Sequence, residues 1–284
     1  MQSNLDKILA SASFRRAYED IDFLKEEDLR PVRLQLELLK PERIMNRESI
    51  HSTIVVFGSA RIPTPETSQA ALDAAQANAA AHPDDREAQQ QLAQARVAYE
   101  NSKYYREAEE FSRIVSTTCQ INGNCDFVVV TGGGPGIMEA ANKGAYDVNA
   151  KSVGLAITLP REQAPNEFIT PELCFRFHYF ALRKMHFLLR AKAMVAFPGG
   201  FGTLDEVFET LTLIQTQKKS LIPVMMFGES YWRKLINFDF LAEQGMITYD
   251  DLKLFRFVES AQEAWDHITD FYQERGQWPF NGKK

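Results

Sequence analysis

Three glycines and two carboxylates lie together in the stretch Pro198-Gly-Gly-Phe-Gly-Thr-Leu-Asp-Glu206. The apolar run at 193–197 before it is typical of a buried strand, and residues 207–214 after it favour a helix. Glycine lets the backbone come close to a ligand, and the start of a helix supplies free N–H groups and the positive end of the helix dipole. The stretch therefore predicts an anion site of the phosphate-binding type.

Asp205 and Glu206 place two negative charges beside this predicted anion site, which is unusual because carboxylates do not help to bind a phosphate. One interpretation is structural: Thr203 and Glu206 match the S/T-x-x-E capping box. The other is chemical: a carboxylate near a bound phosphate could face the part of the ligand that becomes positive during a reaction. On spacing alone the structural interpretation is the simpler one, and both stay open at this point.

Two further glycine loops follow strand-like runs. The run 53–57 ends in Gly58-Ser59-Ala60-Arg61, where Ser59 could donate a hydrogen bond to a phosphate or ribose oxygen and Arg61 could pair with a phosphate. The run 126–131 leads into 132–136, which contains Gly133 and Gly134 and precedes another helix-like segment. This makes a second loop compatible with an anion.

The second loop does not match the standard nucleotide motifs. Glu139 occupies the place of the third glycine in a dinucleotide fingerprint, and no Gly-Lys-Ser/Thr follows, as a P-loop would require. Glu139 and Asn142 could instead reach a ribose or a base.

The alternation of strand-like and helix-like segments from 53 to 240 predicts an α/β fold, a Rossmann-like doubly wound parallel sheet. Further strands are expected at 152–158, 174–180 and 221–227, and helices at 181–191, 231–240 and 261–274. In such a sheet the three glycine loops meet at the carboxyl ends of the strands. Arg183 then lies near the start of the helix that leads into the strand at 193–197.

Two segments lie outside this alternation. Residues 1–50 are charged, contain no glycine and predict an N-terminal helical extension, and residues 51–284 form the expected Rossmann-like domain. Within that domain, residues 66–100 are rich in Ala and Gln and predict either a helical hairpin inserted after the first strand or one kinked helix.

Composition limits the function classes. The chain has 284 residues, a net charge of −6 and a pI near 5.5, which argues against a nucleic-acid polymer as the partner. Three cysteines without metal-ligand spacing predict reduced thiols and no metal site. No secretory signal and no apolar run of membrane length is found, so we expect a cytoplasmic protein without a membrane partner.

The motifs resemble those of the LOG family, the cytokinin riboside 5′-monophosphate phosphoribohydrolases that are often called possible lysine decarboxylases. The stretch 198–206 matches the family's PGGxGTxxE motif, and Arg183-Lys184 lies fifteen residues before it, as in the family's RK element. The loops at 58–61 and 132–139 fall in family order. The resemblance covers roughly 53–227, and the extension and the Ala/Gln-rich insertion make this chain longer than the compact members.

The resemblance implies hydrolysis of the N-glycosidic bond of a nucleoside 5′-monophosphate, such as AMP or a cytokinin ribotide, to the free base and ribose 5-phosphate. It implies no cofactor, and it implies a homo-oligomer, a dimer or larger. Glu206 would stabilise the positive charge at the anomeric carbon and activate water. Arg183 would orient the substrate or stabilise charge on the departing base.

The remaining candidates would bind the substrate. The 5′-phosphate would be held by backbone N–H groups and a hydroxyl in the stretch that carries Gly199, Gly200, Gly202 and Thr203. Lys184, in the RK element, is a further substrate-binding candidate.

Two other functions compete with this one. A non-catalytic nucleotide or molybdenum-cofactor carrier of the same fold would use the glycine loops but would not need Glu206. A pyridoxal-phosphate decarboxylase is disfavoured, because no lysine is singled out for a Schiff base.

Overall fold

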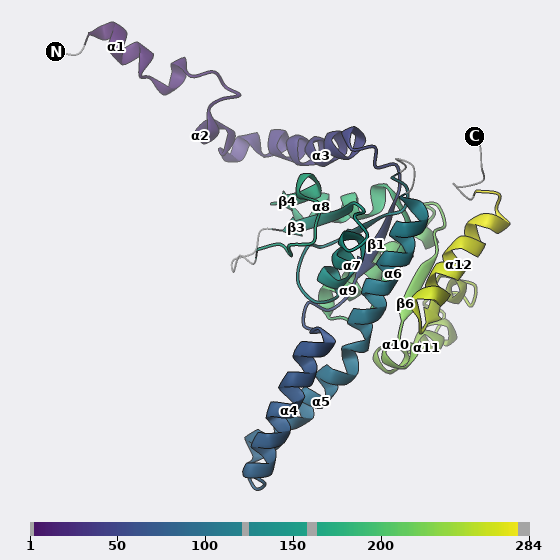
Figure 1. The fold of residues 1–284 in the computed structure, drawn as a ribbon. Helices are drawn as coiled ribbons and strands as arrows, with labels where there is room; N and C mark the ends of the chain where they lie inside the picture. The colour runs from purple at the N-terminus through teal and green to yellow at the C-terminus, as the bar shows by residue number, and fades with distance from the viewer. Residues whose placement is uncertain (1–2, 121–124, 158–163, 278–284) are drawn as a thin grey trace.

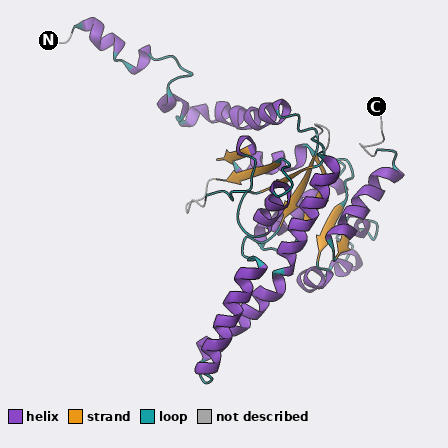
Figure 2. Ribbon diagram, viewed as in Figure 1, coloured by secondary structure: helices purple, strands orange, loops and turns teal. Residues whose placement is uncertain are grey.

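The computed structural model describes residues 3–120, 125–157 and 164–277. In this part of the chain, seven parallel strands form one sheet in the order β4-β3-β2-β1-β5-β6-β7 (Figure 2). The strands are β1 (Thr53–Phe57), β2 (Val128–Thr131), β3 (Ser152–Ile157), β4 (Cys174–Phe177), β5 (Ala191–Ala196), β6 (Val224–Phe227) and β7 (Arg256–Val258). The α/β doubly wound fold expected from the sequence is confirmed.

Helices cover both faces of the sheet. The helices are α1 (Asn4–Leu9), α2 (Ile21–Leu24), α3 (Arg30–Arg47), α4 (Pro65–Ala81), α5 (Arg86–Asn101), α6 (Lys103–Cys119), α7 (Ile137–Tyr146), α8 (Phe180–Leu189), α9 (Phe201–Gln215), α10 (Glu229–Leu235), α11 (Phe238–Glu243) and α12 (Ala261–Glu274), with 3-10 turns η1 (Ala12–Phe14), η2 (Glu27–Leu29), η3 (Pro171–Leu173) and η4 (Asp251–Leu254). Helices α6, α7 and α12 pack on one face, and α3, α8, α9, α10 and α11 pack on the other.

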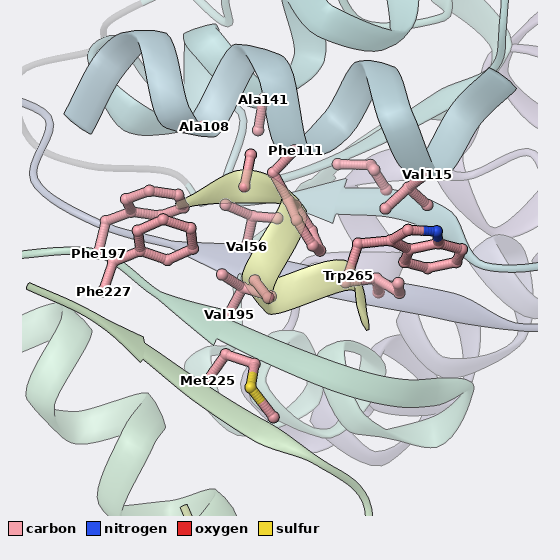
Figure 3. Close-up of a cluster of buried hydrophobic side chains, with 14 of the residues drawn as sticks. Val56, Ala108, Phe111, Val115, Ala141, Val195, Phe197, Met225, Phe227 and Trp265 are labelled. Atoms are coloured by element: carbon pink, nitrogen blue, oxygen red, sulfur yellow. The ribbon is translucent and has the colours of Figure 1, made fainter. Parts of the chain in front are cut away.

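The central strands of the sheet are mostly apolar and buried, and the exposed Lys192 of β5 is an exception. Strand β1, Thr-Ile-Val-Val-Phe, has no exposed position, as expected for a parallel sheet covered on both sides. Val56 and Val195 point toward α6, with Phe111 and Trp265 beside them (Figure 3). The rings of Phe197 and Phe227 stack with centroids 4.1 Å apart, which ties the end of β5 to the end of β6.

The sheet reverses its winding between β1 and β5. The chain moves outward from β1 through β2 and β3 to β4, crosses back to β5, and then continues in the other direction to β7. A crevice opens at such a switch point, at the carboxyl ends of the strands, and ligands bind there in open α/β sheets. The loops after β1 and β5 are the two that flank this point.

The extension and the insertion are both helical. Helix α3 lies along the body of the molecule, whereas α1 and α2 extend away from it (Figure 1). The insertion is the hairpin alternative, since α4 and α5 pack against each other and project from the body (Figure 1). Residues 82–85 form the turn between the two helices, and Asp85 caps α5 by accepting a hydrogen bond from the N–H of Glu87.

Several elements differ from the sequence expectation: β4 ends at Phe177 and β6 begins at Val224, so both are shorter than expected, and α9 begins at Phe201, earlier than expected. The helix expected at 231–240 is divided into α10 and α11, because Asn237 accepts a hydrogen bond from the N–H of Phe240 and starts a new helix. Strand β7 was not predicted, since three residues at a sheet edge are too short to show a period of two.

Candidate active site

The three glycine loops meet at the backbone of Ser59. Its N–H donates to the carbonyl oxygen of Pro198 over 3.0 Å, and its carbonyl oxygen accepts from the N–H of Ile137 over 3.1 Å. Gly136 has φ +70° and a Cβ there would lie 2.5 Å from the Ser59 oxygen, so only glycine allows the second loop to come this close. The loops after β1, β2 and β5 thus form one surface at the switch point.

Helix α9 begins inside the glycine stretch. Its first residue is Phe201 and its N-cap is Gly200, without a capping bond from a side chain. Thr203 and Glu206 are therefore both internal to the helix, and the capping box expected from their spacing is wrong. In the first turn the N–H of Thr203 already donates to the carbonyl oxygen of Gly200 over 3.0 Å. The N–H groups of Phe201 and Gly202 precede it, where a helix offers them no acceptor of its own, so these two are the ones available to an anion.

The glycines of this stretch have different roles. A Cβ at Gly199 would lie 2.1 Å from Oγ1 of Thr203, so this glycine lets the loop pack against the helix. At Gly200 and Gly202 a Cβ would meet nothing within 4 Å, which leaves the backbone open to a ligand. Gly58, predicted to bind substrate, is required by packing, because a Cβ there would lie 2.6 Å from the side chain of Ile137.

Glu206 is a buried carboxylate in the second turn of α9. Glu206 is 5% exposed, and its Oε2 atom has no hydrogen-bond partner among the described residues. Burial raises its pKa from 4.5 to about 7, and the ammonium of Lys184 acts in the opposite direction. It lies one turn after Thr203, so both side chains are on the same buried face of the helix. An acid of this pKa can carry or accept a proton near neutral pH.

Arg183 approaches the same region from α8. Its Nε donates to the carbonyl oxygen of Leu155 over 2.6 Å, and its guanidinium lies over the ring of Phe187 at 5.0 Å. A Cβ at Gly132 would lie 2.7 Å from Nη2, so the second glycine loop makes room for this cation. Burial lowers the pKa of Arg183, while the charge of Glu206 acts to raise it, which shows that the two groups interact electrostatically.

Lys184 of α8 forms two ion pairs with α9. Its Nζ pairs with Asp205 Oδ2 over 2.9 Å and with Glu209 Oε2 over 3.0 Å, so its ammonium joins α8 to α9. Lys184 also supplies positive charge near Glu206, and its direct contact with a substrate stays a prediction.

A buried polar network below the second loop was missed by the sequence interpretation. Asn142 is fully buried, and its Oδ1 accepts from Thr131 Oγ1 at 2.7 Å and from Asn166 Nδ2 at 3.0 Å. The N–H of Asn166 donates to the carbonyl oxygen of Gly133, and Thr131 Oγ1 accepts from the N–H of Gly133. Asn142 therefore supports the loop from below, which replaces the expected contact with a ribose or base.

The other predicted residues lie around the rim of the loops. Gly133 has φ +75° and shapes the turn of the second loop. Gly134 accepts a hydrogen bond from Asn166 through its carbonyl oxygen. Glu139 accepts from the hydroxyl of Tyr105 at 2.9 Å on the side of α6, and the exposed Arg61 donates its N–H to Ser59 Oγ.

A second missed residue, Tyr231 of α10, holds the stretch after β5. Its hydroxyl donates to the carbonyl oxygen of Gly199 over 2.6 Å. Nothing in the local sequence singles out this tyrosine, since its role depends on the packing of α10 beside β5.

We looked for metal-ligand clusters and for membrane-spanning helices among the described residues. In the part of the chain that the structure describes, no three His, Cys, Asp or Glu side chains are grouped so that they could hold a metal ion. Over the same residues, none of the helices has the length and the apolar character needed to cross a bilayer.

Solved structures with a similar fold include two molybdenum-cofactor proteins. The molybdenum cofactor binding protein from Rippkaea orientalis is 18% identical, with a TM-score of 0.43 over 59% of this chain and 87% of that one. The Moco carrier protein from Chlamydomonas reinhardtii is 17% identical, with a TM-score of 0.45 over 78% and 98%.

Curated relatives are plant enzymes. The probable cytokinin riboside 5′-monophosphate phosphoribohydrolase LOGL3 of Oryza sativa subsp. japonica is 25% identical over 158 residues, which cover 52% of this chain and 71% of that protein. The cytokinin riboside 5′-monophosphate phosphoribohydrolase LOG1 of Arabidopsis thaliana is 26% identical over 155 residues, 53% and 70% of the two chains.

The family model described as possible lysine decarboxylase matches residues 138–268, which include Arg183, Lys184 and the whole stretch 198–206. This match and the named relatives confirm the resemblance seen in the motifs, and the chain is similar to the LOG proteins over these residues.

Proposed function

We propose that this protein hydrolyses the N-glycosidic bond of a nucleoside 5′-monophosphate of the AMP type, releasing the free base and ribose 5-phosphate. One observation carries the proposal: a buried carboxylate with a pKa near 7, Glu206, lies on the same helix as an open phosphate-type loop, one turn further on. A carrier needs the loop but has no use for an ionisable acid beside it.

The phosphate is bound at the start of α9. The N–H groups of the first turn and the hydroxyl of Thr203 are the donors, and the positive end of the helix dipole favours the anion. No side chain fills the space above Gly200 and Gly202, which allows phosphate oxygens to approach the backbone. Fixing the phosphate here fixes the position of the attached ribose.

Glu206 then acts at the anomeric carbon. As the C1′–N bond breaks, its electron pair leaves with the base and the ribose becomes positive. The carboxylate stabilises that charge and accepts a proton from the water that forms the new C1′–O bond. Its pKa near 7 suits this task, because a base works best when its pKa is close to the working pH.

Arg183 supplies the fixed positive charge of the site. Its position beside the second glycine loop and Leu155 of β3 supports a role in orienting the substrate or in stabilising negative charge on the departing base. The guanidinium does not act as a proton donor, since it stays charged in proteins.

The proposal is tested by incubating the protein with AMP, GMP, CMP and cytokinin ribotides and measuring free base by chromatography. Release of base from at least one of them is expected, and Glu206→Gln should reduce it at least a hundredfold, the usual scale for a general base. Asp205→Asn, an exposed carboxylate of the same helical turn, is the control and should keep most of the activity. If a nucleotide binds but no base is released, the result would contradict the enzymatic function and favour the function of a nucleotide carrier.

We also propose that the protein assembles as a homo-oligomer. Phe201 is 92% exposed at the first residue of α9, and it borders a hollow of about 480 Å³. The lining of this hollow is mixed: Phe201, Leu204, Phe208 and Leu213 of α9 are apolar, and Lys184 of α8 with Asp205, Glu209 and Thr212 of α9 are polar or charged. Phe180 and Met185 of α8 add further exposed apolar surface. Light scattering coupled to size-exclusion chromatography measures the mass, and a monomer at micromolar concentration would contradict this proposal.

A further inference from the structure

Helix α3 of the N-terminal extension contacts α8, the helix that carries Arg183 and Lys184 (Figure 1). The two helices come from segments about 140 residues apart in the sequence. Four side chains of α3 make polar contacts with α8 or its cap residues, namely Arg33, Glu37, Glu42 and Asn46. The extension therefore adjoins an element of the candidate active site.

The start of α8 is held by the carboxylate of Glu37. Oε1 accepts from the N–H of His178 over 2.8 Å, and Oε2 accepts from the N–H of Tyr179 over 3.2 Å. Tyr179 is the N-cap of α8 and makes no capping bond with its own side chain. The carboxylate of Glu37 thus fixes the backbone of the N-cap residue and of the residue before it, and its negative charge suits the positive end of the helix dipole.

Arg33 strengthens this contact. Its Nε donates to the hydroxyl of Tyr179 over 3.2 Å, and its Nη1 donates to the carbonyl oxygen of Leu24 over 2.8 Å. The same side chain therefore links the N-cap of α8 to the segment before α3.

The end of α8 is held by Glu42. Its two oxygens accept from Nη2 and Nε of Arg190, the C-cap residue, at 2.7 and 3.3 Å. The buried ring of His186 lies 3.7 Å from Glu42 on the same side of the helix. Both ends of α8 are consequently fixed by one helix of the extension.

Arg183 shares one broad face of α8 with the residues that contact α3. Arg183, His186, Phe187 and Arg190 are spaced i, i+3, i+4 and i+7; Arg183 bonds to Leu155 of β3, whereas His186 and Arg190 approach Glu42 of α3. Arg183 lies one turn after Tyr179 and its N–H bonds to the Tyr179 carbonyl. The backbone that Glu37 fixes is therefore the turn from which Arg183 projects.

We propose that Glu37 is a positioning residue for Arg183, and that the N-terminal extension is in this way a working part of the active site. The inference rests on the proposed phosphoribohydrolase function, in which Arg183 acts on the substrate. Loss of Glu37 loosens the first turn of α8 and allows the guanidinium to leave its place beside Gly132.

The test is a mutant cycle with AMP as substrate. Glu37→Gln should lower kcat about tenfold, because displacing a catalytic group by a fraction of an ångström has effects of this order or larger. KM should change less than twofold, since the two N–H groups that Glu37 binds, those of His178 and Tyr179, belong to the start of α8 and not to a glycine loop. Glu37→Asp, which keeps the charge, should recover part of the loss.

The background variant Arg183→Ala separates positioning from general stability. With Arg183 absent, Glu37→Gln should have no further effect on kcat, whereas a merely structural role would lower kcat by the same factor in both backgrounds. Glu100→Gln, an exposed carboxylate on the projecting α5, is the matched control and should behave as the wild type.

Amide hydrogen exchange at 178–184 is measured on the same variants. Faster exchange in Glu37→Gln, with unchanged exchange in the sheet, is the expected result, because capping bonds protect the first turn. If the wild type released no base, the proposed function would fail while faster exchange would still support the positioning of α8. Unchanged exchange, or equal losses of kcat in both backgrounds, would overturn the inference.

Discussion

Tyr231 donates a hydrogen bond from its hydroxyl to the carbonyl oxygen of Gly199 over 2.6 Å. Gly199 belongs to the loop after β5, and the same residue packs against Thr203 at the start of α9. The phosphate-type loop is therefore held from the outside by α10 and from the inside by α9. A loop with two such contacts is fixed before a ligand arrives, which lowers the entropic cost of binding.

Tyr231→Phe should weaken substrate binding while the fold remains. A hydrogen bond of this kind contributes about 1 kcal/mol, so KM for AMP should rise about fivefold and kcat should fall less. Steady-state kinetics measure both values. Tyr249→Phe, an exposed tyrosine, is the control, and an equal rise of KM in the control would contradict the role of Tyr231.

The rate should depend on the ionisation of Glu206. Because the carboxylate is the active form, kcat should rise as the pH increases through about 7 and level off above it. Lys184→Met removes the positive charge that favours ionisation, so the midpoint of this rise should move to higher pH. The pH profile of kcat from pH 5 to 9 measures the midpoint.

Lys253→Met provides the control for that profile. Lys253 is an exposed lysine of η4 that pairs with Asp250, and its loss should leave the midpoint in place. A midpoint that stays the same in Lys184→Met would show that another group titrates.

The titration of Glu206 should also make the folded protein less stable at pH 7 and above than at pH 4.5. Between pH 4.5 and about 7 the folded protein keeps a proton on Glu206 that the unfolded chain has lost, so the stability of the folded state falls as the pH rises through this window. At about 1.4 kcal/mol for each pKa unit, the loss is on the order of 3 kcal/mol. Glu206→Gln has no such titration.

The prediction is measured as a difference. We take the free energy of unfolding of Glu206→Gln and subtract that of the wild type. This difference should be larger at pH 8 than at pH 4.5, by up to about 3 kcal/mol, because only the wild type loses stability through Glu206 as the pH rises. Denaturant titrations at the two pH values give this difference, in which other titrating groups cancel. A difference that does not vary with pH would show that the pKa of Glu206 is not raised.

Gly202→Ala should separate folding from binding. A Cβ at this position meets nothing within 4 Å, and alanine in the first turn of a helix is expected to raise stability by about 0.5–1 kcal/mol. The same methyl group lies where phosphate must approach the backbone, so KM for AMP should increase at least tenfold. Thermal unfolding and kinetics on one preparation check both statements.

Gly245→Ala serves as the reference for that pair of measurements. Gly245 also has open space around it, but its φ is +69°, so alanine should be destabilising there and should leave KM unchanged. If KM is unchanged in Gly202→Ala, the result would contradict the binding of phosphate at this loop.

The sheet could be predicted from the sequence because its strands carry their own signal. Runs such as 54–57 and 193–197 are apolar throughout and are followed by glycine or proline, and their alternation with helices predicts the topology. The start of α9 was placed too late, since two glycines argue against a helix by propensity alone. Contacts of Gly199 with Tyr231 and Thr203 fix this turn, and they override that preference.

The candidate site was predictable only where its residues are close in the sequence. Glu206 and the stretch 198–203 form one motif, and Arg183 precedes it at a fixed spacing. Glu37 and Asn166 contact the site from 141 and 32 residues away, measured to His178 and Gly134. Such contacts exist only after the sheet has formed, so no local pattern in the sequence marks these residues.

The backbone of Ser59, which joins the loops after β1, β2 and β5, also sets the time at which the site can first exist. Its two partners are Ile137 and Pro198, so the ribosome must add 139 residues after Ser59 before the last one is present. At about 5–20 residues per second this takes roughly 7–28 seconds. A nucleotide consequently cannot stabilise an early chain, and it favours only molecules whose β5 has already joined the sheet.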